Sequence, residues 1–349
     1  MRFGLFTLFD HYPEDQSAQE YYQFLIDEIV YAEQLGFDSV WLGEHHFCDY
    51  LCPSPPVFAA AVAQRTKRIR IGTAAALPAL ADPVRMAEEY AMLDVLSNGR
   101  VDFGVGRGFQ TDSYHAFNKP MDESRELLME AVDFIDKAWT ADGPLTYKGR
   151  YREVDQLPIL PQPVQKPRPP IWMAGSLSPE SYQFAGEQGF NLMMATVFSP
   201  LDKFIPLADL YREKANEAGH DLGRMRISVA NHCYVGTSSK QAKTLWEKYY
   251  MRYIKFFSSL LDSPAYRLSK QHQAFTRLKD LLENISFNYA TATMAICGDA
   301  QETIDRVAKA HDMSGNTDFW IYTDLGGLPR EEVFASLKRF AEQVMPKFR

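Results

Sequence analysis

Short apolar runs alternate along the chain with longer stretches in which apolar and polar positions follow a helical period. The runs expected to form strands cover residues 2–8, 38–43, 69–76, 101–105, 171–174, 191–195, 225–235 and 318–323. The amphipathic stretches expected to form helices cover residues 18–35, 55–66, 83–97, 121–140, 178–188, 201–219 and 330–344. Strands that alternate with helices predict a parallel sheet, and eight such units favour a closed (β/α)8 TIM barrel over an open doubly wound sheet.

The whole chain, residues 1–349, is expected to form this one barrel domain. The Pro-rich stretch at 158–170 is the best candidate for a boundary, but the strands expected on either side of it fit one barrel. The region from about 237 to 297 is too long for a simple crossover and predicts an insertion before the last strand. Its part at 262–290 is interpreted either as a lid over the barrel mouth or as a structural insertion, and the pattern favours neither.

Charge and apolar content narrow the classes of partner. The chain carries a formal net charge of −8 and has no block rich in lysine and arginine. Nucleic acid and anionic membranes bind basic surfaces, so neither is expected as a partner. No apolar run reaches the roughly 18 residues of a membrane span, and the first residues predict a strand in place of a signal peptide. The sequence therefore favours a cytoplasmic protein.

The cysteines Cys48, Cys52, Cys233 and Cys297 do not predict a site. The first two are close in sequence, but no second close pair completes a zinc site. Four cysteines in a chain of this length do not make a disulfide framework. We expect buried or partly buried thiols and no metal site.

Residues with chemical potential follow the expected strands directly. They are Glu44, His45 and His46 after the second strand, Ala74 and Ala75 at the end of the third, Gly106, Arg107 and Gly108 after the fourth, and Gly175 and Ser176 after the fifth. The carboxyl ends of barrel strands share one face, and that face carries the active site. We therefore expect these residues to meet at one mouth.

The two histidines are adjacent, so their side chains are expected to point to opposite faces. Such a pair does not easily chelate one metal ion. An imidazole at a barrel mouth can hold or transfer a proton near neutral pH, whereas a single histidine is more often structural. His45 and His46 are therefore candidates for proton chemistry.

The segment around Arg107 predicts an anion site. Residues 104–108 (GVGRG) fail the dinucleotide fingerprint, because Phe109 stands where another glycine is needed and no helix opens directly behind them. Arginine matches phosphate oxygens well, and Arg125 near the start of the fourth helix can meet the same anion. The alternative for Arg125 is an ion pair with Asp122, Glu126 or another surface carboxylate.

The junction at residues 175–180 (GSLSPE) is a second element of that anion site. Ser178 is expected to be a helix N-cap with Pro179 at the first helical position. Free backbone N–H groups and the helix dipole at such a junction can bind phosphate, although a plain capped helix is also common.

In order along the chain, a set of short motifs resembles the α subunits of bacterial luciferases. The motifs are residues 37–42 (FDSVWL), 44–47 (EHHF), 71–75 (IGTAA), 83–85 (PVR), 93–100 (LDVLSNGR), 103–108 (FGVGRG), 124–125 (SR) and 344–346 (VMP). Each motif alone is weak, but the combination is specific and covers nearly the whole chain. The sequence is thus similar to the luciferase-like flavin-dependent monooxygenase family.

The resemblance implies a two-component enzyme that takes reduced FMN (FMNH2) from a separate flavin reductase. It implies reaction with molecular oxygen through a flavin C4a-hydroperoxide that oxygenates a small organic substrate. By motif match, His45 is the catalytic histidine, and Glu44 orders the neighbouring backbone or the histidine. Ala74 and Ala75 match a non-proline cis peptide under the flavin ring.

The resemblance also assigns Arg107, Arg125 and Ser176 to the phosphate site. Gly175 and Pro179 replace a Glu and a Thr of luciferase there, so that a phosphate contact is either lost or made by Ser178. Gly106 replaces a reactive cysteine, which leaves more room beside the flavin. The family further implies a dimer built on the helices at 55–66 and 83–97, here a homodimer because this chain keeps the catalytic histidine.

Two other functions on the same scaffold stay open. The first is hydride transfer with the deazaflavin F420, which does not activate oxygen. The second is a non-catalytic flavin-binding or partner subunit, against which the retention of His45 and Arg107 argues. A barrel hydrolase lacks support, because the sequence has no nucleophile elbow. Aromatic and sulfur side chains that are interpreted as pocket lining or as barrel core are Phe6, Trp172, Met193, Phe198 and Trp320.

Overall fold

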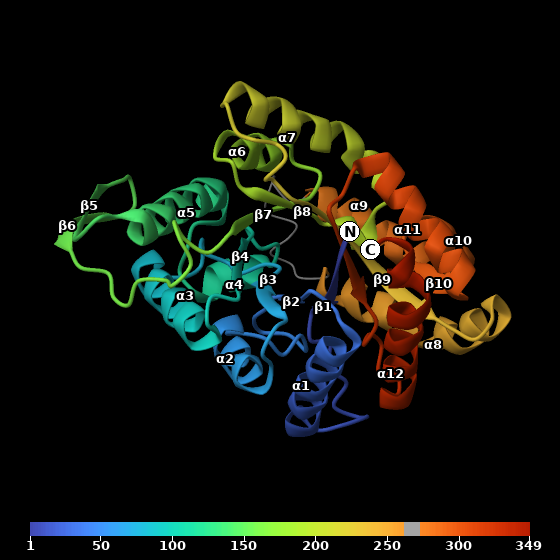
Figure 1. Cartoon of the computed structure of the whole chain (residues 1–349). Coiled ribbons are helices and arrows are strands. Elements are labelled where there is room, and N and C mark those ends of the chain that lie inside the picture. Colours follow the sequence, from blue (N-terminus) through green and yellow to red (C-terminus); the bar gives the residue numbers. More distant parts are fainter. Residues whose placement is uncertain (262–272) are drawn as a thin grey trace.

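A computed structural model of the chain describes residues 1–261 and 273–349, and for residues 273–276 it describes the backbone alone. Within these residues, eight parallel strands close into a barrel (Figure 1). The barrel strands are β1 (Arg2–Thr7), β2 (Ser39–Leu42), β3 (Arg70–Thr73), β4 (Val101–Val105), β7 (Ile171–Gly175), β8 (Asn191–Met194), β9 (Ile227–Val235) and β11 (Asp318–Tyr322). The predicted (β/α)8 barrel is confirmed.

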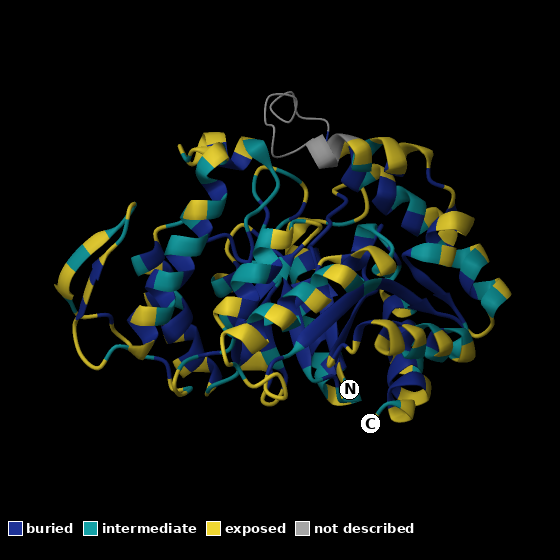
Figure 2. Ribbon diagram, turned by 90° about the horizontal axis from the view of Figure 1, so that it is seen from above, coloured by how far each residue is buried: buried dark blue, intermediate teal, exposed yellow. Residues whose placement is uncertain are grey.

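The strands pair in the order β9-β11-β1-β2-β3-β4-β7-β8, and the pairing of β8 with β9 closes the ring. A short ninth strand, β10 (Ile296–Gly298), extends the sheet by pairing with the second half of β9. The first and last residues lie at one end of the barrel, where the Met1 amino group donates to the Phe348 carbonyl at 2.9 Å (Figure 2).

Helices surround the barrel and bury its outer surface (Figure 2). They are α1 (Ala18–Leu35), α2 (Pro55–Arg65), α3 (Pro83–Ser97), α5 (Ser124–Thr140), α6 (Pro179–Glu187), α7 (Ile205–Glu217), α8 (Ser239–Leu260), α9 (Gln273–Asn284), α10 (Phe287–Thr293), α11 (Ala300–Ser314) and α12 (Arg330–Arg339). None of the described helices is long and apolar enough to cross a membrane.

Local signals explain several helix ends. Ser17 caps α1 in a reciprocal pair with Glu20, and Gly36 ends that helix with φ of 88°. Asn98 ends α3 in the left-handed conformation with φ of 57°, and Gly99 follows it with φ of 75°. Asparagine tolerates this conformation because its short polar side chain can hydrogen-bond locally.

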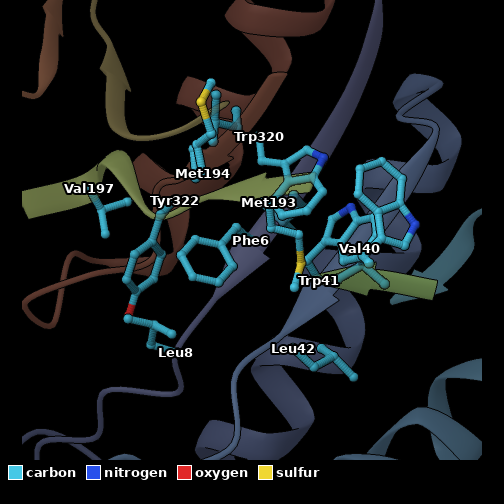
Figure 3. Packing of buried hydrophobic residues seen from close by; sticks show 14 of the residues in the cluster. Phe6, Leu8, Val40, Trp41, Leu42, Met193, Met194, Val197, Trp320 and Tyr322 are labelled. Atoms are coloured by element: carbon cyan, nitrogen blue, oxygen red, sulfur yellow. The ribbon is translucent and has the colours of Figure 1, made fainter. Parts of the chain in front are cut away.

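The barrel interior is filled by aromatic side chains. The rings of Trp41 and Trp320 stack with centroids 3.9 Å apart, and Trp172 lies 5.0 Å from Trp41. Glycines make room for them, since a Cβ on Gly72 would lie 2.3 Å from the Trp41 ring. Figure 3 shows this packing together with Phe6, which lies beside Tyr322. The interior is therefore a packed core, and a cavity can open only above it.

The sequence missed two features of the connections. An antiparallel hairpin of β5 (Leu145–Lys148) and β6 (Glu153–Leu157) projects beside α5, and a short helix α4 (Thr111–Ala116) follows β4 (Figure 1). The insertion before β11 folds as α8 to α11 with β10. The predicted lid at 262–290 falls partly on residues 262–272, which lie outside the described residues. Its described part is α9 and the start of α10.

Candidate functional site

A cavity of about 290 Å³ opens at the carboxyl ends of the barrel strands. Nine residues that the sequence analysis singles out line it: Glu44, His45, Ala74, Ala75, Gly106, Arg107, Arg125, Ser176 and Ser178. Gly175, which the sequence also places in the site, does not line it. Its carbonyl accepts from the Tyr182 hydroxyl at 3.1 Å, and a Cβ at this position would lie 2.6 Å from that ring. Gly175 therefore provides room for Tyr182 beneath the site.

His45 lies in the turn that follows β2, and its backbone is fixed on two sides. The Glu44 N–H donates to the Ala75 carbonyl at 3.3 Å, and the His45 N–H donates to the Cys52 carbonyl at 3.0 Å. The imidazole packs 4.4 Å from the Tyr50 ring, and its Nδ1 is buried without a hydrogen-bond partner among the described residues. Burial, and to a lesser degree the neighbouring His46, lowers the pKa of His45 to about 3. The ring is therefore neutral near pH 7 and offers a nitrogen that can accept a hydrogen bond.

His46 points away from this cavity, as expected for adjacent residues. Its Nε2 contacts the Glu44 carboxylate at 2.9 Å, and its ring packs against Phe117. The other Glu44 oxygen accepts from the Leu77 N–H at 3.1 Å. Glu44 thus ties the turn after β2 to the segment after β3 and positions His45 through the backbone, without a contact to its ring.

The segment after β3 forms one wall of the cavity. The peptide bond between Ala74 and Ala75 is cis, which agrees with the resemblance. Gly106 faces this segment, and a Cβ on it would lie 2.9 Å from the Ala75 methyl carbon. The room beside Gly106 is therefore largely taken up by Ala75, and a side chain at position 106 would require a shift of the backbone.

Arg107 brings a positive charge to the rim. The Tyr114 hydroxyl, which comes from α4, donates to the Arg107 carbonyl and fixes its backbone. Burial lowers the pKa of the Arg107 guanidinium, and the nearby Arg125 lowers it further. An arginine remains charged despite such shifts. Two guanidinium groups that repel each other favour the binding of an anion between them.

Arg125, Ser178 and Glu180 form a hydrogen-bonded group at the same rim. Arg125 Nη2 donates to Ser178 Oγ at 3.2 Å, and Nη1 lies 3.1 Å from Glu180 Oε1. Ser178 Oγ in turn donates to Glu180 Oε2 at 2.5 Å. The expected surface carboxylate partner of Arg125 is therefore Glu180, and not Asp122 or Glu126. Ser178 is the N-cap residue of α6 as predicted, but its side chain makes no capping bond.

Aromatic side chains form an apolar part of the cavity wall. Phe198 and Phe257 stack with centroids 3.8 Å apart, and Phe109 lies 5.8 Å from Phe257. Phe6 and Phe198 line the cavity, whereas Trp172, Met193 and Trp320 belong to the barrel core. The sequence did not single out Phe257, because it comes from α8 inside the insertion and no motif marks it.

The arrangement separates two kinds of chemistry within one cavity. One end offers guanidinium and hydroxyl donors for an anion, which is how proteins bind phosphate. The other end offers a neutral histidine among apolar walls that exclude water. No group of three or more His, Cys, Asp or Glu side chains in residues 1–261 and 273–349 is arranged to hold a metal ion.

Comparison with known proteins finds monooxygenases among the relatives of this chain. The sequence model of the luciferase-like monooxygenases matches residues 1–317. The oxygenase component of a flavin-dependent trigonelline monooxygenase from Acinetobacter baylyi is 30% identical, over 100% of this chain and 96% of that protein. An alkanal monooxygenase alpha chain from the Kryptophanaron alfredi symbiont is 28% identical, over 99% and 98% respectively.

Solved structures agree on the fold. The monooxygenase RslO1 from Streptomyces bottropensis superposes with a TM-score of 0.85 at 26% identity and covers 100% of both chains. An F420-dependent secondary alcohol dehydrogenase has a TM-score of 0.77 at 21% identity, over 100% of this chain and 99% of that one. This second likeness shows the fold alone.

We predict that Glu180→Gln strengthens the binding of inorganic phosphate at the rim. The Glu180 carboxylate holds both Arg125 and Ser178, so it competes with an incoming anion. Removing its charge should tighten binding roughly fivefold, which corresponds to about 1 kcal/mol. Isothermal titration with phosphate measures the change. Glu217→Gln, an exposed acid paired with Lys214 elsewhere, serves as the control. Equal affinity in Glu180→Gln and wild type would place the anion elsewhere.

Proposed function

The chain belongs to the luciferase-like monooxygenase family, and we propose that it is the oxygenase of a two-component system that uses FMNH2 and O2. It is a flavin-dependent monooxygenase by this membership. We propose further that a separate reductase supplies the FMNH2 and that the substrate is a small organic molecule. The name of the Acinetobacter relative, an oxygenase component, supports the separation of the two activities.

The observation that carries the choice of FMN is the charged rim beside the apolar cavity. Arg107, Arg125, Ser176 and Ser178 would hold the phosphate. Ala74, Ala75 and Gly106 line the cavity beside this rim, and their small size leaves room for a ring system to lie against the backbone. The residues present therefore fit a planar cofactor with a terminal phosphate.

Each part of the chain has a role in this reaction. When bound, reduced flavin would supply the chemistry that activates molecular oxygen. Phe109, Phe198 and Phe257 keep water from the reacting groups, because they cover the cavity with apolar surface. His45, neutral at pH 7, accepts or holds a proton at its imidazole. Glu44 keeps the backbone of His45 in place, because its carboxylate accepts a hydrogen bond from the Leu77 N–H.

Arg107→Ala tests the assignment of the phosphate site. Loss of a charged donor should weaken FMN binding roughly tenfold to hundredfold, which corresponds to about 1.5–3 kcal/mol. Riboflavin lacks the phosphate and should bind both proteins equally. Fluorescence titration with FMN, riboflavin and F420 gives the constants, with the exposed Arg224→Ala as the control. An equal loss for FMN and riboflavin would remove Arg107 from the phosphate site, and selective tight binding of F420 would replace the proposed cofactor.

We also propose that the chain forms a homodimer through α2 and α3. Val57, Met92, Val95 and Leu96 expose apolar side chains on these two helices, which pack on each other. Contiguous exposed apolar groups are typical of a protein interface. The interpretation of these helices as an interface follows the family resemblance.

The double variant Val57→Asp, Met92→Asp should be a monomer, because two charges cannot be buried in an apolar interface without partners. Light scattering after size-exclusion chromatography measures the mass. Val164→Asp changes an exposed valine outside α2 and α3 and should leave the mass unchanged. A wild-type mass of one chain, or a double variant that stays dimeric, would exclude this interface.

A further inference from the structure

A buried polar network lies behind the cavity wall, between His45 and the loop that follows β1. It contains three tyrosines from different elements: Tyr50 from the turn after β2, Tyr253 from α8 and Tyr322 from β11. None of the three is more than 1% exposed to solvent. The proposed function uses none of them. Their hydroxyl groups therefore require a separate explanation.

The network begins at the cavity with His45. The imidazole packs 4.4 Å from the Tyr50 ring, and the Tyr50 hydroxyl donates to the Tyr253 hydroxyl at 3.0 Å. The Tyr253 ring also stacks on Phe198, a residue of the cavity wall, at 6.1 Å. A change at Tyr253 can thus reach the cavity by two contacts.

The network ends at Asp10, which is buried in the loop after β1. Asp10 forms a backbone bridge with Tyr50, and its carboxylate accepts from the Tyr322 hydroxyl and, at 2.7 Å, from the Gly326 N–H. The Tyr322 ring meets the Tyr253 ring edge-on at 5.6 Å. After burial, the charge of Asp10 is the strongest influence that raises the pKa of Tyr253. Asp10 is therefore coupled to the tyrosine that accepts from Tyr50.

Asp10 is also the carboxyl group here that can titrate near neutral pH. Burial raises its pKa to about 7, although hydrogen bonds from Tyr322 and Gly326 oppose the shift. Glu28 of α1 and Asp324 after β11 face it, and burial raises the pKa of both far above the usual range. Neither Glu28 oxygen has a hydrogen-bond partner among the described residues. Burial therefore favours the neutral form of Glu28 and Asp324 beside Asp10.

Several other titratable groups around Asp10 have pKa values that are shifted away from this range. Burial raises the pKa of Tyr12 and Tyr21 well above the usual value. Burial lowers the pKa of His232, which packs against Tyr253 and Tyr322, to about 3. Arg252 lies 3.9 Å over the Tyr12 ring and is paired with Glu14 and Asp15. His11, the sequence neighbour of Asp10, packs its ring 5.5 Å from the Tyr21 ring. The contribution of Asp10 is therefore isolated by the variant Asp10→Asn and not by pH alone.

We propose that Asp10 is a positioning residue for the cavity, whose carboxyl controls, through Tyr253 and Tyr50, the hydrogen bonding and proton affinity beside His45. The inference rests on the proposed function in so far as the groups beside His45 are reduced flavin and oxygen. An ionised Asp10 adds negative charge behind the wall and so favours the protonated form of any acid or base in the cavity.

The test uses the flavin-free chain labelled with ¹⁵N at histidine, so that it does not depend on the cofactor. The His45 ring signals are identified by their loss in His45→Gln and followed from about pH 5 to about pH 9. In the wild type they should shift with a midpoint near the Asp10 pKa of about 7. In Asp10→Asn, which keeps an acceptor oxygen for Tyr322, the shift should be absent. Its persistence in that variant would overturn the proposal.

A second variant separates transmission from loss of the carboxyl group. Tyr253→Phe removes the acceptor of the Tyr50 hydroxyl but leaves Asp10, so the infrared carbonyl band of Asp10 should still titrate while the His45 shift disappears. Glu28→Gln, a buried acid in the same cluster without contact to Tyr50, should keep the His45 shift. Retention of the His45 shift in Tyr253→Phe would contradict transmission through the hydroxyl pair.

The consequence for the reaction is measured separately. The rate at which bound reduced FMN is oxidised should show a step near pH 7 in the wild type and none in Asp10→Asn. Failure of the wild type to bind FMN would reject the proposed function while leaving the histidine result intact. Normal FMN binding with identical pH profiles in both proteins would reject the role of Asp10.

Discussion

Closure of the barrel through the pairing of β8 with β9 is the constraint on which the site depends. This pairing makes all eight strands parallel members of one ring, so that their carboxyl ends meet at one mouth. Residues as distant in sequence as His45, Arg107 and Ser178 line the same cavity for this reason. The tryptophans below them fill the barrel interior and leave the mouth as the place where a ligand can enter. Loss of the closing pair would open the ring between β8 and β9, where Phe198, which follows β8, stacks on Phe257 of α8.

At the mouth of the barrel, burial and intrinsic basicity together determine which side chains are charged. His45 is neutral because burial removes the water that would stabilise a charged imidazole. The arginines keep their charge because a guanidinium group is too basic to release its proton. The cavity therefore carries both positively charged guanidinium groups and a neutral imidazole. Glu180 satisfies the rim when no anion is present, so the donors there are paired before a ligand arrives.

The sequence predicted the barrel and most of the site because both follow from local patterns. Apolar runs marked the barrel strands, and the polar residues after them marked the mouth. The hairpin of β5 and β6 was missed because both strands are short: β5 alternates over only four residues, and β6 has no buried residue. Gly175 was misplaced as a contact because the glycine makes room for Tyr182, a neighbour seven residues away that no motif marks. Glu180, Phe257 and the tyrosine network depend on tertiary contacts, which a single sequence does not contain.

The reaction with oxygen is the most direct test of whether this cavity is an oxygen-activating flavin site. The protein with bound FMNH2, prepared without oxygen, is mixed with oxygenated buffer in a stopped-flow spectrometer, beside the His45→Ala variant. We predict that the wild type forms a species spectrally distinct from both reduced and oxidised FMN, which persists because water is excluded. In His45→Ala the flavin should still bind, but this species should decay faster. Immediate return of the wild type to oxidised flavin, at the rate of free FMNH2, would contradict an oxygen-activating site.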